Sequence, residues 1–466
     1  MEEFGLEELP KIHKLIVLDS LVAAKKQDLD FLRKSNEVHG FEGERNLHKL
    51  YQEMFKENII SFVNRQIIIT LLTILIVLVC FLYWSPRRIN NGFSLVFELP
   101  IKLRSRKNAE DLSGFFLEER IPIKKSTKII IENKKINFLP QELKNLKLVF
   151  HSELFLISRM GLFDRFYVVT SCLHNFFLMF RKRSLATALR ISYRQFLLEI
   201  PVSTVAIREN MLDWVATTNS NYLSQHSIFY VASKTSLPTY MFWYSENSVT
   251  KSFSHDLDTF DYDQFRNIAV KEHFVWTLEF ANFLKNYSTS KITCIGSILF
   301  YPREIQPSLI KDLDILIFDV TPFTTATKRD FYNYERCTRF LYALLSLQQR
   351  LTRREVIIAL KPKRTFSSAH DSKYISNLVK MESEPYKWKL VDPSANLYHL
   401  IARSRLVVGI PFTSAVLIAK ELNVQCCYFL DSDDYIFPEF FHGIPVIRNL
   451  SDLENLFLKS CRKGIQ

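Results

Sequence analysis

Hydrophobic residues in the C-terminal part of the chain fall into short continuous runs, separated by longer stretches with helical spacing. Short apolar runs rich in β-branched residues are typical of strands buried on both faces of a parallel sheet. The runs predict strands at 292–300, 315–320, 356–360, 389–391, 406–410 and 426–429. The stretches between them predict helices at 329–350, 373–381, 395–404, 412–422 and 452–459. Alternation of this kind predicts a doubly wound α/β domain over residues 291–466.

The preceding region, residues 87–290, mixes both kinds of pattern without a regular repeat. Its β-branched runs predict strands at 128–131, 202–207, 227–231 and 239–244. An apolar stretch at 166–180 contains His174 and Asn175, which makes it a poor membrane span. We expect it to be a core or membrane-facing helix of a first α/β domain, whose strand order the pattern does not fix.

Residues 67–84 form an uninterrupted apolar run without a charged side chain. Its 18 residues are about the minimum for crossing the hydrocarbon core of a bilayer. Tyr83 and Trp84 supply an aromatic end, and arginines flank both sides. The run therefore predicts one transmembrane helix over residues 65–86, preceded by a helical segment at 1–64. It lies too far from the start to be a cleaved signal peptide.

Charge helps to orient this segment. The chain has a formal net charge of +12. Residues 1–64 carry nine Lys/Arg and twelve Asp/Glu, a net of −3, which leaves +15 for the rest. Lys and Arg near the span favour a cytoplasmic C-terminal body, so we expect a single-pass protein of the inner (plasma) membrane. A basic body suits anionic lipids or anionic substrates. No recognised nucleic-acid-binding motif is present, and no nucleic acid partner is expected.

The residue types that form common cofactor and metal sites are poorly represented. The chain has 39 Phe but only ten Gly, and it contains no Gly-x-Gly-x-x-Gly or Walker-type loop. Any phosphate site must therefore depend on helix ends and cationic side chains. The cysteines and histidines lack the spacing of metal ligands, so neither a metal nor a resident cofactor is expected.

The segment 406–418 carries the most specific signal in the sequence. A buried strand ends near Gly409 and is followed by Pro411, Phe412, Thr413 and Ser414. Pro suits the first turn of a helix, where hydroxyl groups would lie beside free backbone N–H groups and the positive end of the helix dipole. The segment is thus a candidate phosphate cradle. An ordinary strand, turn and helix with a polar cap is the alternative.

The string Pro-Phe-Thr-Ser at 411–414 resembles the signature of the bacterial polysaccharide-biosynthesis PFTS-motif proteins. Further strings at 243–248, 317–322 and 360–364 are similar to that family as well. The resemblance covers roughly residues 230–460. It implies a glycosyltransferase with two Rossmann-type domains (the GT-B architecture) that uses a nucleotide-activated sugar as co-substrate.

Polar residues follow two other predicted strands at the edge where ligands of parallel sheets bind. Lys361, Lys363 and Arg364 follow the strand at 356–360 and could neutralise the phosphates of a departing nucleotide. A solvated basic loop is the alternative. Asp319 lies at the end of the strand at 315–320 and could bind a ribose hydroxyl, act on the acceptor or cap a turn.

Inverting sugar transfer needs a general base to deprotonate the acceptor hydroxyl. Glu246, which follows the strand at 239–244, is one candidate, and His370 is a second. A structural role is the alternative for each. With Asp319, these residues form the predicted catalytic set, whereas Lys361, Lys363, Arg364 and residues 411–414 form the predicted donor-binding set.

The sequence therefore predicts a membrane-anchored glycosyltransferase that acts on a surface polysaccharide or a lipid-linked glycan. The expected partners are a nucleotide sugar, the glycan acceptor and the membrane. Two alternatives stay open at this point. One is a polyol-phosphate transferase of the CDP-glycerol type, and the other is a non-catalytic scaffold of a glycan-assembly complex.

Overall fold

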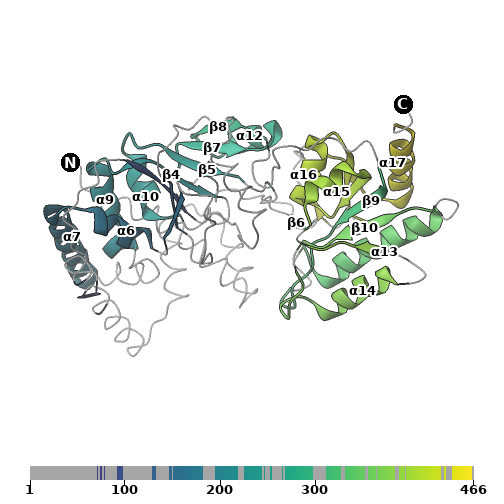
Figure 1. Cartoon of the computed structure of the whole chain (residues 1–466), viewed down its shortest axis with the longest axis horizontal. Coiled ribbons are helices and arrows are strands. Elements are labelled where there is room, and N and C mark those ends of the chain that lie inside the picture. Colours follow the sequence, from purple (N-terminus) through teal and green to yellow (C-terminus); the bar gives the residue numbers. More distant parts are fainter. Residues whose placement is uncertain are drawn as a thin grey trace.

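The fold is a tandem of two α/β domains (Figure 1). The computed structural model describes residues 71, 74, 75, 78, 92–97, 129–132, 146–149, 151–181, 195–218, 225–243, 246, 252–253, 265, 268–296, 311–326, 331–351, 355–363, 365–383, 388–393, 395–431, 435–436 and 443–463. The predicted helical segment at 1–64 and the basic residue Arg364 lie outside this part of the chain.

The first domain is built on a seven-stranded sheet whose neighbouring strands all run parallel. The strands are β1 (Phe93–Phe97), β2 (Ile129–Glu132), β3 (Leu146–Val149), β4 (Leu212–Thr218), β5 (Thr239–Phe242), β7 (Glu272–Val275) and β8 (Lys291–Cys294). Their order in the sheet is β3-β2-β1-β4-β5-β7-β8. The order reverses between β1 and β4, which is the switch point where doubly wound sheets bind ligands.

Helices cover this sheet (Figure 1). They are α6 (Ser152–Arg159), α7 (Leu162–Arg181), α10 (Ser227–Ser233), α12 (Leu278–Leu284), and the π-helical turn η2 (Gln195–Glu199), which continues into α9 (Ile200–Arg208). Alternate residues of each strand enter different apolar clusters. In β1, for example, Leu95 belongs to the cluster under α6, α7 and α9, whereas Val96 belongs to a separate cluster. This alternation is the two-residue period of a strand buried on both faces.

The second domain has a six-stranded sheet, also parallel throughout. Its strands are β9 (Leu313–Phe318), β10 (Ile358–Lys361), β11 (Lys389–Leu390), β12 (Ser404–Gly409), β13 (Gln425–Phe429) and β15 (Val446–Ile447). The order β11-β10-β9-β12-β13-β15 is the 3-2-1-4-5-6 order of the Rossmann fold. Its helices are α13 (Tyr334–Arg350), α14 (Ser372–Glu382), α15 (Leu397–Ala402), α16 (Ser414–Glu421) and α17 (Leu450–Lys463). The doubly wound architecture predicted for the second domain is confirmed, and the parallel sheet of the first domain agrees with the two Rossmann-type domains that the resemblance implies.

Two segments predicted as strands are helices instead. Residues 202–207 lie within α9 and residues 227–231 within α10. Both are rich in β-branched residues, which favoured a strand. Local signals for a helix outweigh that preference, because Pro201 lies in the first turn of α9 and the ring of His226 caps α10. Both helices also pack against each other and against η2, and this packing favours the helical state further.

The boundary between the domains also differs from the expected position at residue 291. The strand predicted to open the second domain is β8, which pairs with β7 and completes the first sheet. The second sheet begins only with β9. The run at 292–300 has the apolar character of either sheet, so its pattern could not decide which one it joins.

Among the described residues, a strand pair and an ion pair are two of the contacts that join the domains. Strand β6 (Ser252–Phe253) pairs antiparallel with β14 (Tyr435–Ile436) from the other half of the chain. An ion pair connects Lys420 Nζ of α16 to Glu279 Oε1 of α12, 2.9 Å apart.

Among the residues that the structure describes, no helix is long and apolar enough to cross a membrane. Most of the predicted span at 65–86 lies outside those residues. The four described positions within it, Leu71, Ile74, Leu75 and Leu78, are helical and 49–60% exposed.

Candidate functional site

The carboxyl edge of the second sheet brings together the two segments predicted to bind the donor and the segment of Asp319, a predicted catalytic residue. Strands β10, β9 and β12 are adjacent, so the residues that follow them emerge side by side. Hydrogen bonds tie the segments together. Lys363 N, after β10, donates to Asp319 Oδ1, after β9, at 3.2 Å. Phe412 N, after β12, donates to the hydroxyl of Tyr332 in the segment between β9 and α13, at 3.1 Å.

Asp319 links several segments at this edge and is not an exposed catalytic group. Its side chain is buried, and Oδ2 accepts hydrogen bonds from Tyr374 Oη at 3.0 Å and Thr321 Oγ1 at 3.3 Å. Burial raises the pKa of Asp319 to about 6, against the lowering effect of these hydrogen bonds and of the nearby Lys361. The carboxyl group therefore joins β9, the segment after β10 and α14, and fixes their relative positions.

Lys361 and Lys363 differ in what they can offer a ligand. Lys361 is the last residue of β10 and is 7% exposed, and its Nζ donates to the carbonyl of Pro393 at 2.7 Å. Burial lowers the pKa of Lys361, although Asp319 partly offsets this effect. Lys363 is exposed on the same edge. Of the two lysines predicted to bind phosphate, Lys363 is exposed and Lys361 is buried with its ammonium group on a backbone carbonyl.

The turn at 411–414 departs from the predicted phosphate cradle. Pro411, Phe412 and Thr413 are buried, and α16 begins at Ser414 rather than at the predicted Phe412. The hydroxyl of Thr413 donates back to Ile410 O at 2.9 Å, so it faces the turn and not a ligand. The turn is buried because the Phe412 ring packs edge-on against the ring of Tyr428 in the core. Ser414, at the start of α16, is the part of the predicted cradle that is not fully buried.

Gly409 ends β12 where α16 packs against it. A Cβ atom at this position would overlap Thr413 Oγ1 and lie 2.5 Å from Val416 Cγ2. Glycine is required here by close packing between strand and helix, as in other doubly wound domains.

Gly409→Ala should destabilise the second domain by about 1–3 kcal/mol, because the added methyl group overpacks the start of α16. Urea unfolding of the wild type, Gly409→Ala, Val416→Ala and the double variant measures this effect. The double variant should lose less stability than the two single variants together, since Val416→Ala removes one of the overlapping groups. Strict additivity would show that the methyl group is accommodated elsewhere.

Glu246 is fully buried at the end of the first domain's β5 segment, and its contacts are structural. Oε1 accepts hydrogen bonds from Trp276 N at 2.6 Å and Thr277 N at 3.2 Å, and Oε2 accepts one from Thr277 Oγ1 at 2.7 Å. Burial raises the pKa of Glu246 to about 8. These bonds anchor the start of α12, whose N-cap is Thr277. They account for Glu246 without a catalytic role.

His370 is buried on the second domain's carboxyl edge, stacked on Phe323 with ring centroids 5.1 Å apart. Its Nδ1 accepts a hydrogen bond from Ser367 N at 3.1 Å. In the neutral ring the proton must then reside on Nε2. Nε2 of His370 therefore carries the proton, is buried without a hydrogen-bond partner among the described residues, and in this tautomer cannot act as the predicted base.

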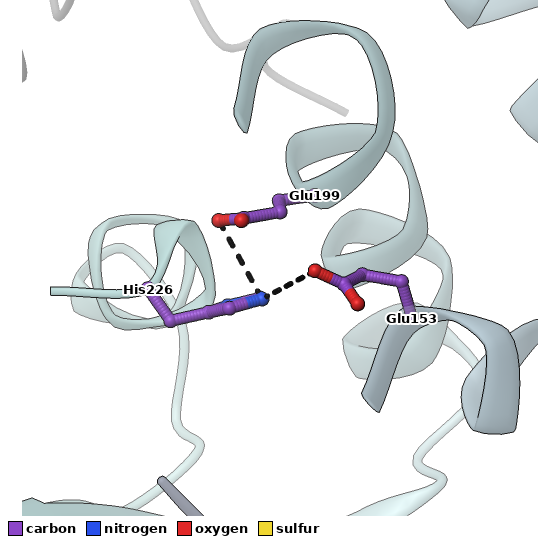
Figure 2. Close-up of side chains that lie close together, drawn as sticks. All are labelled: Glu153, Glu199 and His226. Carbon is purple, nitrogen blue, oxygen red and sulfur yellow. Dashed lines mark hydrogen bonds and ion pairs between the residues drawn. The ribbon is translucent and has the colours of Figure 1, made fainter. Parts of the chain in front are cut away.

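A second polar cluster, which the sequence patterns did not indicate, lies at the carboxyl edge of the first sheet. Figure 2 shows Glu153 and Glu199 approaching the ring of His226. His226 Nε2 lies 3.3 Å from Glu153 Oε1 and 3.5 Å from Glu199 Oε2. Phe97, the last residue of β1, stacks on the His226 ring at 4.4 Å between centroids. Because His226 follows β4, the cluster lies at the switch point between β1 and β4.

Two carboxylates of this edge are held by helix N-termini. Glu132, the last residue of β2, accepts a hydrogen bond at Oε2 from Ser152 N, the first residue of α6, at 2.8 Å. Glu199 Oε2 accepts from both N and Oγ of Ser227, the first residue of α10, at 3.1 and 3.0 Å. A carboxylate at a helix N-terminus satisfies free N–H groups and complements the helix dipole. Glu153 is instead bonded to His226.

The tautomer of His226 follows from its second ring nitrogen. Nδ1 accepts a hydrogen bond from Ile228 N at 3.2 Å, so Nε2 carries the proton of the neutral ring and donates it toward Glu153. Burial lowers the pKa of His226, but the surrounding carboxylates, Glu199 foremost, outweigh burial and raise it.

The same tautomer bears on metal binding. The ligand atoms of Glu153, Glu199 and His226 lie within 4.8 Å of one another, a spacing that a single ion could bridge. A histidine ligand must present a deprotonated nitrogen to the metal. Here Nε2 needs its proton because Nδ1 faces a backbone donor. The cluster is therefore better suited to orient a carboxylate than to hold a metal.

No local motif could have revealed this cluster, because its residues come from four separate elements between Glu132 and His226. The available signal was topological. Each residue follows a strand or begins a helix on the ligand side of the sheet, but the strand order was needed to show that these ends meet.

Comparisons with known proteins bear on the whole chain. The model of the family described as "Polysaccharide biosynthesis PFTS motif protein" matches residues 180–457, more than half of the chain. A search of curated proteins found no significant match. Among solved structures, the UDP-GlcNAc 2-epimerase of Methanocaldococcus jannaschii is 15% identical, covers 80% of this chain and 92% of its own, and gives a TM-score of 0.41.

Two further solved structures give similar values. The wall teichoic acid polymerase TagF is 12% identical, with 86% of this chain and 90% of its own covered and a TM-score of 0.41. The O-GlcNAc transferase of Thermobaculum terrenum is 10% identical, with 91% and 71% covered and a TM-score of 0.38. These structural likenesses are too weak to support an argument about activity.

Proposed function

We propose, from the premise that the chain belongs to the polysaccharide biosynthesis PFTS motif family, that it is a glycosyltransferase of the GT-B type. It transfers a sugar from a nucleotide-activated donor to a surface polysaccharide or a lipid-linked glycan. The apolar run at 67–84 anchors it in the plasma membrane, with the two α/β domains on the cytoplasmic side, where activated sugars are made. The two successive Rossmann-type sheets are the observation that carries this proposal.

The donor nucleotide binds at the carboxyl edge of the second sheet. Lys363 is exposed there, and the N-terminus of α16 offers backbone N–H groups at Ser414. Asp319 acts as a positioning residue, since its bond to Lys363 N fixes the segment that carries the exposed lysine. Negative charge that develops on the leaving nucleotide would be stabilised by these groups.

The acceptor hydroxyl is deprotonated at the carboxyl edge of the first sheet. We assign the general base to Glu153, which is buried like Asp319 and whose Oε1 accepts the Nε2–H of His226. This hydrogen bond orients the carboxylate. The proton leaves the acceptor oxygen as that oxygen attacks the anomeric carbon, and the bond from that carbon to the nucleotide phosphate breaks.

Nucleotide binding by the full-length protein in detergent is the first test. Isothermal titration with UDP, CDP, GDP and ADP should show binding of at least one of them. Lys363→Ala should weaken that binding by about tenfold or more, because a hydrogen bond to a charged group contributes about 1.5–3 kcal/mol. The matched control is Lys380→Ala, another exposed lysine, in the last turn of α14.

Transfer from the corresponding nucleotide sugars then tests the reaction. Failure of all four nucleotides to bind would contradict the proposal and favour the scaffold alternative. Selective use of CDP-glycerol, with no transfer from any nucleotide sugar, would instead identify a polyol-phosphate transferase. An equal loss of affinity in the Lys363 and Lys380 variants would show that the donor site does not lie at the carboxyl edge.

A further inference from the structure

Helix α7 exposes a row of large apolar side chains. Leu162, Phe163, Phe166 and Leu173 are 59%, 89%, 61% and 37% exposed. Positions 162, 166 and 173 are separated by four and seven residues, so they share one face of the helix. Exposed apolar residues that line up on one helix face mark an interaction surface, whereas isolated ones are ordinary.

The opposite face of α7 is firmly held by the first domain. Val168, Val169 and Cys172 are buried in its core. Asp164 forms an ion pair with Arg208 across 2.8 Å, and the Arg208 guanidinium also lies over the ring of Tyr167. The exposed row is therefore a fixed feature of the domain.

The beginning of α7 lies at the amino edge of the first sheet. Arg208, its ion-pair partner through Asp164, ends α9, and the chain reaches the start of β4 four residues later. Phe93, the first residue of β1, donates its N–H to Met211 O at the same edge. The apolar row and the start of β1 thus lie at one end of the domain, and α7 is on the side away from the second domain (Figure 1).

The length of the chain relates this edge to the membrane segment. Only residues 85–92 separate Trp84, the end of the apolar run, from Phe93. Even a fully extended chain covers no more than about 30 Å over that distance. If residues 67–84 lie in a bilayer, the amino edge of the first sheet must lie near its surface. Arg87, Arg88 and, beside the apolar row, Arg159 suit anionic headgroups.

We propose that the apolar row of α7 inserts into the interfacial layer of an anionic lipid bilayer. The inference rests on the membrane anchoring in the proposed function and adds a second, peripheral contact to it. A helix of this kind buries its apolar side about 5–10 Å into the boundary between headgroups and acyl chains. Two contacts, unlike one flexible tether, would fix the orientation of both domains relative to the membrane.

Depth measurement in vesicles tests this inference directly. Full-length protein with Phe163→Cys, and with Cys80, Cys294 and Cys461 replaced by serine, is labelled with the environment-sensitive fluorophore NBD. It is then reconstituted into vesicles of phosphatidylcholine and phosphatidylglycerol. Val379→Cys on α14 is the matched control, since Val379 is an apolar residue of the second domain that is 54% exposed. The readouts are the emission maximum and the rate of reduction by aqueous dithionite.

The label at 163 should emit at shorter wavelength and be reduced several-fold more slowly than the label at 379. Equal emission and equal reduction in vesicle-bound protein would overturn the inference while leaving the anchor and the transferase proposal intact. Protein that does not associate with vesicles would overturn both the anchor and the inference. Protection at 163 that depends on protein concentration, and not on lipid, would assign the surface to a second copy of the chain.

Discussion

Glu153→Gln should slow sugar transfer by about 10²- to 10⁴-fold, the usual contribution of a general base, while nucleotide binding stays unchanged. The substitution preserves the shape of the side chain and keeps an oxygen that accepts the Nε2–H of His226. It removes the ability to take a proton. The rate of transfer and the affinity for the nucleotide, measured on the same preparation, separate chemistry from binding.

Glu132→Gln is the matched control for this variant. Glu132 lies in the same cluster, but its oxygen accepts a hydrogen bond from the start of α6, which a glutamine oxygen can also accept. Its transfer rate should stay close to that of the wild type. A purely structural role for Glu153 predicts a different result: a lower midpoint of thermal unfolding, and an unchanged rate for each folded molecule. That outcome would contradict the assignment of the base.

Asp319→Ala should cost the second domain several kcal/mol of stability and abolish nucleotide binding with it. The substitution leaves the buried hydroxyl of Tyr374 without its acceptor and frees Lys363 N, and each unsatisfied buried group costs about 1–3 kcal/mol. It also deprives the buried ammonium of Lys361 of a nearby negative charge. Urea unfolding measures the loss, and Thr321→Ala, which removes only one weak donor, should cost far less.

Acid titration offers an independent check on Asp319. Because burial raises its pKa from an ordinary 3.8 to about 6, the folded protein binds a proton more readily than the unfolded chain. The resulting stability is fully present below pH 4 and is lost as the pH rises through 6, by about 3 kcal/mol. Asp319→Asn cannot ionise, so this part of the pH dependence should disappear. A wild-type profile that coincides with that of Asp319→Asn would contradict the raised pKa.

The second domain could be predicted from sequence because the apolar residues of its strands and of its helices recur with different spacing. Runs such as 406–410 are continuously apolar and β-branched, and the intervening stretch at 334–350 has clear helical spacing. The first domain was harder to predict because α9 and α10 carry the composition of strands. Their helical state depends on packing against η2 and on a histidine cap, neither of which a local pattern contains.

The site illustrates the same limit. The sequence located the edge at which Asp319, Lys363 and Ser414 meet, because residues after parallel strands gather there. It could not show that Thr413 and Lys361 turn their donors inward, since that depends on the carbonyls of Ile410 and Pro393, which accept them. The cluster of Glu153, Glu199 and His226 was out of reach because it depends on strand order alone.

The length of β4 sets a distance that the acceptor must span. Its seven residues cross the first sheet from the edge near α7 to the edge near His226, a rise of about 20 Å. With the α7 edge at the bilayer surface, a sugar joined directly to a lipid headgroup would fall short of Glu153. The protein would then not act on newly started glycan chains. It would extend only those chains whose growing end already lies beyond the headgroups.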